Sequence, residues 1–240
     1  MNSIQGKVIL VTGAGQGLGA EIAKTVAADG ATIIACDVKA DKLDQITSEI
    51  RNAGGKISTF LMDVTDEKNV EDVLRKAVQE HGKLDVLVNN AGIDFTKSVE
   101  DLSIEEWDKV IKVNLRGPFI LSKLAFPYLL KSGQGHIVNI VSTASKRTWS
   151  EASAYHASKW GFLGFSHALH VEARQKGIKV TAVIAGGMKT PFILERFPEA
   201  EPNLQDPKNV ADTVKFVLTQ PAETVIPEVM VIPMRETSWP

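Results

Sequence analysis

A chain of 240 residues that is 44% hydrophobic and 23% charged has enough apolar material for one sizeable core and the polarity of an ordinary globular domain. Lysine and arginine together number 27 and aspartate and glutamate 29, and this near balance argues against nucleic acid or an anionic membrane as the main partner. The single cysteine, Cys36, excludes an intramolecular disulfide and a cysteine-based zinc cluster, and the five histidines lack metal-ligand spacing, so no metal is expected.

The polar start of the chain and the length of its apolar runs decide the expected compartment. Residues 1–7 lack the apolar core of a secretory signal, and no apolar run approaches the length of a membrane span. We therefore expect a cytoplasmic protein that does not bind a membrane.

Strand-like and helix-like segments alternate along the whole chain. Near-continuous apolar runs predict strands at 7–12, 31–36, 57–62, 84–88, 136–141, 178–184 and 228–232. Amphipathic or capped segments between them predict helices at 17–29, 39–53, 66–81, 104–114, 117–131, 154–176 and 209–218. This alternation indicates a Rossmann-like, three-layer α/β fold with a doubly wound, mainly parallel sheet in a single domain over 1–240.

The glycine-rich stretch from Thr12 to Gly19 follows the first predicted strand and opens the first predicted helix. Its glycines permit a tight turn and a close approach to a pyrophosphate, and the helix N-terminus supplies N–H groups for the anion. The spacing Gly-x-x-x-Gly-x-Gly differs from the commoner Gly-x-Gly-x-x-Gly, and a glycine turn without a ligand is the alternative. The residues predicted to bind a dinucleotide here are Gly13, Gln16, Gly17, Leu18 and Gly19.

The ends of the next three strands extend this predicted cofactor site, because ligands of such sheets bind beyond the carboxyl ends of the strands. Asp37 is placed to accept hydrogen bonds from both ribose hydroxyls of adenosine and to repel a 2′-phosphate, which favours NAD over NADP; its alternative is helix capping. Asp63 and Val64 are placed to meet the adenine ring, although Asp63 could equally be a plain turn former. The small polar segment after the fourth strand adds Asn90, Ala91 and Gly92.

Tyr155 and Lys159 lie four residues apart at the start of a predicted helix and therefore share one face. A free tyrosine titrates near ~10, and a close cation favours the phenolate and lowers its pKa, so this pair suits proton exchange with an alcohol or ketone. An exposed pair of the same spacing is the alternative. Ser142 adds a hydroxyl at the end of a strand, and Asn114 ends a predicted helix, as a site residue or as a C-cap.

Five motifs occur along the chain in a fixed order: Thr12-Gly13-x-x-x-Gly17-x-Gly19, Asn89-Asn90-Ala91-Gly92, Asn114, Ser142 and Tyr155-x-x-x-Lys159. In this combination they resemble the short-chain dehydrogenase/reductase family, in its compact single-domain branch. The resemblance implies that Tyr155 is the catalytic acid/base and that Ser142 holds the substrate oxygen. It also implies that Lys159 binds the nicotinamide ribose and lowers the Tyr155 pKa, while Asn114 supports a water that links Lys159 to solvent.

The segment after the sixth strand departs from the family pattern, which usually has Pro-Gly and then a threonine near the nicotinamide carboxamide. This chain has Ala185 in place of the proline. The resemblance still implies that Gly186, Met188 and Thr190 contact the cofactor. The C-terminal segment 227–233 lacks the paired-glycine ending common in acyl-carrier-protein reductases of this family, which argues modestly against a role in fatty-acid synthesis.

The combined prediction is an NAD(H)-dependent oxidoreductase that transfers a hydride between nicotinamide and a secondary alcohol or ketone. The substrate is a small molecule whose identity the sequence leaves open. The alternatives are a non-catalytic NAD-binding regulator and a nucleotide-sugar epimerase or dehydratase. The resemblance also implies a homo-oligomer, with a tetramer as the expected form.

The irregular segment 191–207, rich in Pro, Phe and Glu, is expected to be a mobile cover over the substrate. Lys146 and Arg147 either attract an anionic substrate or are solvated loop charges. The residues expected to face the substrate indicate a partly apolar pocket: Phe95, Thr143, Ala144, Trp149, His156, Met188, Phe192 and Phe197. Ordinary packing is the alternative for each of them.

Overall fold

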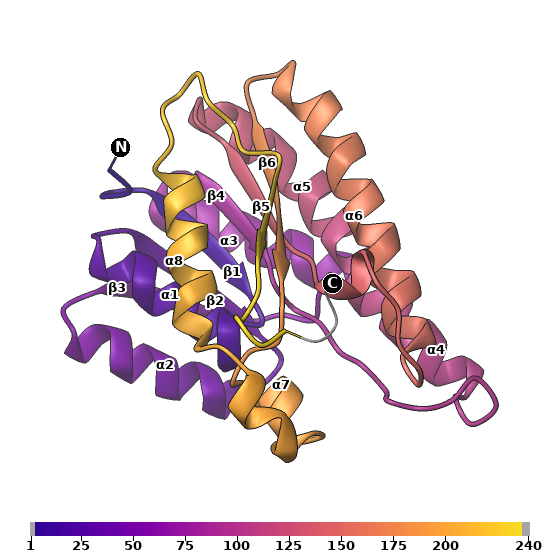
Figure 1. Ribbon diagram of the computed structural model, residues 1–240. Helices are drawn as coiled ribbons and strands as arrows, with labels where there is room; N and C mark the ends of the chain where they lie inside the picture. Colours follow the sequence, from indigo (N-terminus) through magenta and orange to yellow (C-terminus); the bar gives the residue numbers. More distant parts are fainter. Residues whose placement is uncertain (1–2, 237–240) are drawn as a thin grey trace.

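Seven parallel strands lie in one sheet in the computed structural model, which describes residues 3–236 (Figure 1). Their order is β3-β2-β1-β4-β5-β6-β7, and every neighbouring pair is parallel. The predicted doubly wound, Rossmann-like sheet is thereby confirmed. The strands are β1 (Val8–Thr12), β2 (Thr32–Asp37), β3 (Lys56–Leu61), β4 (Val86–Asn89), β5 (His136–Ile140), β6 (Lys179–Ala185) and β7 (Glu228–Val231).

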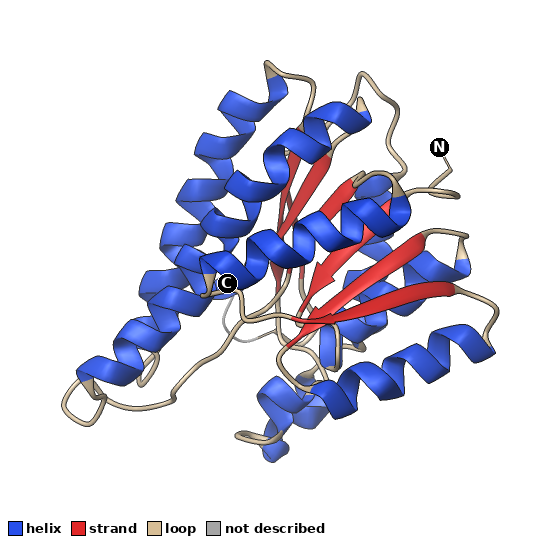
Figure 2. Cartoon of the chain, turned by 180° about the vertical axis from the view of Figure 1, so that it is seen from behind, coloured by secondary structure: helices blue, strands red, loops and turns tan. Residues whose placement is uncertain are grey.

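Helices cover both faces of the sheet, so the molecule has three layers (Figures 1 and 2). One face packs against α1 (Gly17–Ala28), α2 (Ala40–Asn52) and α8 (Pro207–Leu218). The other packs against α3 (Glu67–His81), α5 (Gly117–Ser132) and α6 (Ser153–Arg174). No helix within residues 3–236 is both long and apolar enough to cross a membrane.

The apolar runs form strands because both faces of this sheet are buried. Side chains alternate between the faces of a strand, so Ile9 and Val11 of β1 pack under α1 while Val8 and Leu10 pack on the opposite side. All four are almost fully buried. A continuous apolar sequence, instead of an alternating one, is what such a two-sided environment requires.

The ends of α3 follow the capping rules from which they were predicted. The Asp66 carboxylate accepts hydrogen bonds from the backbone N–H groups of Lys68 and Asn69, at 3.0 and 3.1 Å. At the other end Gly82 adopts a left-handed φ of 77°, which glycine reaches without steric cost. The two residues therefore fix the length of the helix between them.

The two helices predicted at 104–114 and 117–131 are one continuous helical run, so their predicted separation is wrong. Helix α4 (Ile104–Ile111) passes through a π-helical turn, Lys112–Arg116, directly into α5. Pro118 sits at the start of α5, where it has no N–H to donate back to the preceding π turn. A π turn inserts one extra residue per turn and often marks a functional site.

The segment 191–207 contains more structure than its composition indicated. It holds a short helix, α7 (Pro191–Leu194), and a 3₁₀ turn, Pro198–Asn203. Helix α8 begins at Pro207, two residues before the predicted start, because the Asp206 carboxylate caps the N–H of Lys208 at 2.8 Å. The segment lies beside the carboxyl ends of the strands (Figure 1).

The turn between β1 and α1 requires glycine at Gly13 and Gly19 for different reasons. Gly13 has a φ of +62°, in the left-handed region. A Cβ atom on Gly19 would lie 2.1 Å from the Gly13 carbonyl oxygen and 2.6 Å from the Asn90 side-chain nitrogen. Gly19 therefore lets α1 pack directly against the turn that precedes it.

Replacing Gly19 with Ala is expected to force this turn apart. We expect Gly19→Ala to destabilise the fold by about 2 kcal/mol or more, because the new methyl overlaps backbone, and to weaken NADH binding. The matched control is Gly164→Ala in α6, where a Cβ meets nothing within 4 Å and helix propensity should add up to about 1 kcal/mol. Urea unfolding and NADH fluorescence measure both quantities; equal stability of the two variants would contradict the packing argument.

Candidate active site

A cavity of about 950 Å³ opens at the carboxyl ends of the strands. It lies where β1 and β4 are neighbours, which is the point at which the strand order reverses. Ligands of open α/β sheets bind at this position. The residues predicted to bind the cofactor line it, apart from Gly19: Gly13, Gln16, Gly17, Leu18, Asp37, Asp63, Val64, Asn90, Ala91, Gly92, Tyr155, Lys159, Gly186, Met188 and Thr190.

The geometry at the start of α1 suits an anion. Its N-cap residue, Gln16, makes no side-chain cap, and the first turn carries no acidic residue. The first backbone N–H groups of the helix therefore have no side-chain acceptor and lie beside the cavity. Together with the positive helix dipole and the tight glycine turn, these groups fit a pyrophosphate.

Asn90 clamps the glycine turn to the end of β4. Its side-chain nitrogen donates to the carbonyl oxygens of Thr12 and Gly13 at 2.9 and 3.2 Å. In return the Thr12 hydroxyl accepts the backbone N–H groups of Asn90 and Ala91 at 3.0 and 3.1 Å. These four bonds hold two segments nearly 80 residues apart in register on either side of the cavity.

The two predicted adenosine carboxylates differ in their surroundings. Asp37 accepts the N–H of Gly15 at 2.9 Å and that of Lys39 at 3.1 Å, so it is fixed against the glycine turn at the end of β2. Asp63 accepts both the N–H and the hydroxyl of Thr65 at 2.8 Å, which is the arrangement of a turn former. Both line the cavity, but of these two carboxylates only Asp37 accepts an N–H of the glycine turn.

The segment after β6 closes the far end of the cavity. Gly186 donates its N–H to the carbonyl of Val231 at 2.8 Å, which continues the β6–β7 ladder past Ala185. Thr190 is almost fully buried and precedes α7. The loop is therefore anchored by β7 on one side and by α7 on the other, despite the alanine in place of proline.

Ser142, Tyr155 and Lys159 converge on the same cavity from β5 and α6. Ser142 follows β5 and caps the 3₁₀ turn Thr143–Ser145, accepting the N–H of Ala144 at 3.2 Å. The Lys159 side chain is buried; its Nζ donates to the Ile140 carbonyl at 3.0 Å and lies 5.6 Å from the centre of the Tyr155 ring. The three side chains thus share one face of the cavity opposite the glycine turn.

The electrostatics of this trio differ from the sequence expectation. Burial raises the pKa of Tyr155 to about 12, and the hydrogen bond with Ser142 opposes that rise without cancelling it. Burial also lowers the pKa of Lys159 to about 8. The expected lowering of the Tyr155 pKa by Lys159 is not found: burial dominates, and the charges that act on the phenol are Asp94, which raises its pKa, and Arg196, which lowers it. Tyr155 is a protonated phenol near neutral pH.

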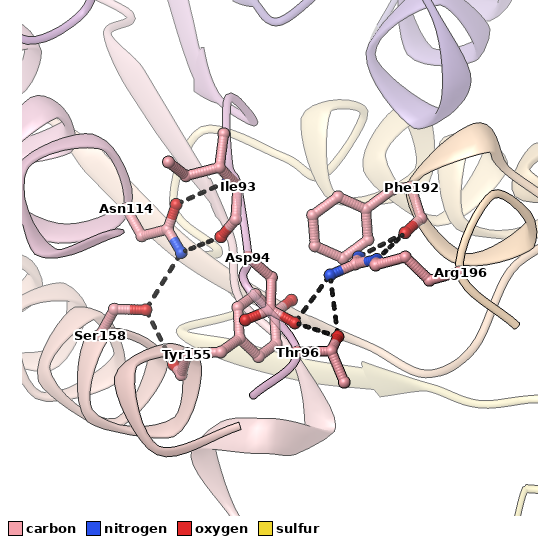
Figure 3. A network of polar contacts seen from close by, with 8 residues as sticks. All are labelled: Ile93, Asp94, Thr96, Asn114, Tyr155, Ser158, Phe192 and Arg196. Carbon is pink, nitrogen blue, oxygen red and sulfur yellow. Dashed lines mark hydrogen bonds and ion pairs between the residues drawn. The ribbon is translucent and has the colours of Figure 1, made fainter. Parts of the chain in front are cut away.

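Asn114 lies inside the π turn between α4 and α5 and is fully buried, so it is no C-cap. Its Oδ1 accepts the N–H of Ile93 at 2.8 Å, and its Nδ2 donates to the Ile93 carbonyl at 2.8 Å and to the Ser158 hydroxyl at 3.1 Å (Figure 3). It does not line the cavity. Asn114 instead joins the loop after β4 to α6, beside the helical turn that carries Lys159.

Several residues expected to face the substrate are elsewhere. His156 is buried, where its ring contacts the Ala144 carbonyl at 2.9 Å and the Trp149 N–H at 3.1 Å. Phe95 and Ala144 do not line the cavity, and Lys146 pairs with Glu228 at 3.0 Å. The expected residues that do line it are Thr143, Trp149, Met188, Phe192 and Phe197.

Asp94 and Arg196 are among the charged residues that line this cavity and that the sequence did not single out. Asp94 follows β4, and Arg196 follows α7; they form an ion pair at 2.7 Å (Figure 3). The position of Asp94 directly after the Asn89–Gly92 segment was a usable signal, because loops at the carboxyl ends of strands form the site. Nothing near Arg196 in the sequence indicates its partner, which lies 102 positions away.

A family model described as short chain dehydrogenase matches residues 7–201. The chain is 37% identical over 196 residues to the 3-oxoacyl-(acyl-carrier-protein) reductase FabG of Thermotoga maritima, covering 82% of this chain and 79% of that protein. It is also 31% identical over 234 residues to an uncharacterized oxidoreductase of Staphylococcus epidermidis, covering 98% and 100%.

Solved structures of the same architecture include several oxidoreductases. A metagenomic short-chain oxidoreductase in complex with NADP has a TM-score of 0.86 at 32% identity, covering 97% of this chain and 99% of that one. A variant of actinorhodin polyketide ketoreductase with NADPH has a TM-score of 0.90 at 30% identity, covering 99% and 100%. These likenesses extend over nearly the whole chain.

The buried Lys159 makes stability depend on pH in a defined direction. Its pKa is about 8 in the folded protein and 10.5 when exposed, so the burial penalty is complete below pH 8 and is lost as pH rises to 10.5. We expect the unfolding free energy of the protein to rise by up to about 3 kcal/mol relative to Lys159→Met across that window. Urea unfolding at several pH values, without added nucleotide, measures the difference; a constant difference would refute it.

Proposed function

Since the chain belongs to the short-chain dehydrogenase/reductase family, we propose that it transfers a hydride between nicotinamide and the carbon of a secondary alcohol or ketone, using NAD(H). The observation that carries this proposal is the convergence of Ser142, Tyr155 and Lys159 on a cavity whose other wall is a glycine turn at a helix N-terminus. A nicotinamide cofactor supplies the hydride; the protein supplies position and a proton.

The residues present fit the cofactor in three places. The free N–H groups at the start of α1 suit the pyrophosphate, and Asp37 at the end of β2 suits the adenosine ribose. Lys159 and the segment from Gly186 to Thr190 suit the nicotinamide half. These three groups of residues together suit the pyrophosphate, the adenosine half and the nicotinamide half of a dinucleotide.

Tyr155 is the proposed acid. As a protonated phenol it can donate its proton to the oxygen of a ketone as hydride reaches the carbon. The Ser142 hydroxyl, hydrogen-bonded to Tyr155, stabilises the negative charge that develops on that oxygen. In the direction of alcohol oxidation the phenol must first lose its proton, which the positive charge of an oxidised nicotinamide and of Lys159 both favour.

We propose NAD as the preferred cofactor on the basis of Asp37. A fixed carboxylate beside the glycine turn can accept both ribose hydroxyls and repels a 2′-phosphate. Lys39 also lines the cavity, and its positive charge would attract a 2′-phosphate, but we expect the repulsion by Asp37 to outweigh that attraction. Since similar proteins were solved with NADP and NADPH, the preference needs a direct test.

A 3-oxoacyl thioester is the second candidate substrate class. The 37% identity to the Thermotoga maritima reductase favours it. The segment 227–233 argues against it, because it lacks the paired glycines common in such reductases. Reduction of acetoacetyl-coenzyme A at a rate above that of simple ketones would establish this class.

The predicted homotetramer is retained as a proposal. Several large apolar side chains are exposed on α4, α5 and α6. This is more exposed apolar surface than we expect on helices that contact only water. The exposed side chains include Trp107, Phe119 and Trp160. A monomeric mass by light scattering would overturn the proposal.

Tyr155→Phe tests the proposed acid. Removal of the hydroxyl should lower kcat by about 10²- to 10⁴-fold, because the proton no longer has a positioned donor. Binding of NADH, followed by its fluorescence, should stay within about threefold of the unchanged protein. Retained turnover of ketones would sink the assignment and leave only a nucleotide-binding protein.

Asp37→Ser tests the cofactor preference. The loss of two ribose hydrogen bonds and of the charge should lower kcat/KM for NADH and raise it for NADPH, changing their ratio by about 10- to 100-fold. Asp41→Ser, at an exposed position on the neighbouring helix α2, is the control. If the unchanged protein already prefers NADPH, the proposed role of Asp37 is refuted.

A further inference from the structure

Arg196 fastens the segment after α7 to the loop after β4. Its Nη1 donates to Asp94 Oδ2 at 2.7 Å and to the Thr96 hydroxyl at 3.4 Å, while its Nε donates to the Phe192 carbonyl at 3.0 Å (Figure 3). The guanidinium also lies 4.3 Å from the centre of the Phe192 ring, and that ring lies 5.8 Å from the Tyr155 ring. The Asp94–Arg196 pair therefore sits over the reactive end of the cavity.

One oxygen of the Asp94 carboxylate is buried and lacks a hydrogen bond in the described part of the chain. The Asp94 side chain is only 9% exposed, and Oδ1 has no hydrogen-bond partner among residues 3–236. Of the buried side-chain atoms without a partner in that range, this is the one that belongs to a carboxylate and to a residue lining the cavity. The backbone N–H of the adjacent Phe95 acts on this carboxylate, but within residues 3–236 no donor completes a hydrogen bond to Oδ1. An unmade hydrogen bond to a buried charged oxygen is costly, so the atom calls for a donor.

We propose that Asp94 Oδ1 accepts a hydrogen bond from a second hydroxyl group of the substrate, so that the enzyme selects hydroxyketones and diols over plain ketones and alcohols. The inference rests on the proposed hydride transfer and specifies its substrate class. Asp94 is then a specificity-determining residue, and Arg196 is the residue that positions it.

The charges around Oδ1 decide which donor it takes. Arg196 already neutralises the carboxylate, so an ammonium group would meet the guanidinium and a carboxylate group would meet Asp94. A neutral hydroxyl carries a donor and suffers neither repulsion. Asp94, Arg196 and Tyr155 line the same cavity, and the Phe192 ring that stacks on the Arg196 guanidinium lies 5.8 Å from the Tyr155 ring, so one small substrate can reach both Tyr155 and Asp94.

Access to Oδ1 involves the segment 191–207. Oδ1 has almost no accessible surface, and the residues nearest to this end of the cavity include Phe192 and Arg196 from that segment. In this proposal a substrate hydroxyl reaches Oδ1 as the segment just after α7 shifts, with Arg196 keeping its bond to Oδ2. Recognition of the hydroxyl and closure of the segment over the substrate are one event.

Matched substrate pairs test the inference directly. Acetoin is compared with 2-butanone, and 2-hydroxycyclohexanone with cyclohexanone, by following NADH oxidation with the full chain. We expect kcat/KM to favour the hydroxyketone of each pair by about 10- to 100-fold, the range of one hydrogen bond to a charged group. Asp94→Ala should abolish most of that preference, and Asp94→Asn, which keeps an acceptor oxygen, should lose less.

The controls separate recognition from folding. Asp101→Asn changes an exposed carboxylate of the same loop, which accepts a hydrogen bond from the Ser98 hydroxyl at 2.8 Å, and should keep the preference of the unchanged protein. Thermal unfolding and NADH fluorescence show whether each Asp94 variant folds and binds cofactor. A loss of preference in a folded Asp94→Ala protein supports the proposal.

The remaining outcomes overturn it in distinguishable ways. If both members of each pair are reduced equally well, or if Asp94→Ala lowers both to the same extent, the recognition role is refuted while the proposed hydride transfer stands. If the unchanged protein binds NADH but reduces neither member of either pair, the proposed function fails, and the inference fails with it.

Discussion

The burial of the Lys159 amine beside the Tyr155 phenol is the constraint around which the rest of the site is arranged. In the chain by itself this burial pushes both groups toward their neutral forms, with the Lys159 pKa near 8 and the Tyr155 pKa near 12. The fold tolerates this because Lys159 has the Ile140 carbonyl as acceptor and because α6 is held rigidly against β6 and the loop after β5. A ligand that brings hydroxyl acceptors to the amine and positive charge to the phenol would move both pKa values back toward their usual ranges. The desolvation that lowers the stability of the free protein therefore favours binding of such a cofactor.

The strand order supplies the rigidity that this arrangement needs. Because β4 follows β3 in the chain but lies next to β1, the loops after β1 and β4 diverge from neighbouring points and leave a gap between them. Thr12 and Asn90 bridge the base of that gap, so neither loop can drift. Asn114 likewise connects the loop after β4 to α6. Its position in the π turn lets its side chain reach the Ile93 backbone and the Ser158 hydroxyl at once.

How far the sequence could predict this site follows from the range of the interactions involved. The strands, the glycine turn and the helical pair Tyr155–Lys159 are set by local periodicity and spacing, and these predictions matched the fold. The sign of the Tyr155 pKa shift was not predictable, because desolvation depends on what the whole fold places around the phenol. The π turn at Asn114 looks like two helices in the sequence, since Gly117-Pro118 is also a good helix start. The Asp94–Arg196 pair spans 102 positions, and no local pattern encodes such a contact.

The pair also connects substrate recognition to the chemistry of Tyr155. Asp94 raises the pKa of the phenol and Arg196 lowers it, so as long as the two stay paired their effects on the phenol largely oppose one another. Were the segment carrying Arg196 to move away alone, the unneutralised Asp94 charge would hold the proton on Tyr155 more tightly and oppose alcohol oxidation. Because Arg196 keeps its bond to Oδ2 in the proposed movement, the counter-charge stays beside Asp94 while Tyr155, the proposed acid, exchanges its proton. Recognition through Asp94 and proton transfer through Tyr155 then depend on the same guanidinium, which explains why a cover segment should carry an arginine into an otherwise partly apolar pocket.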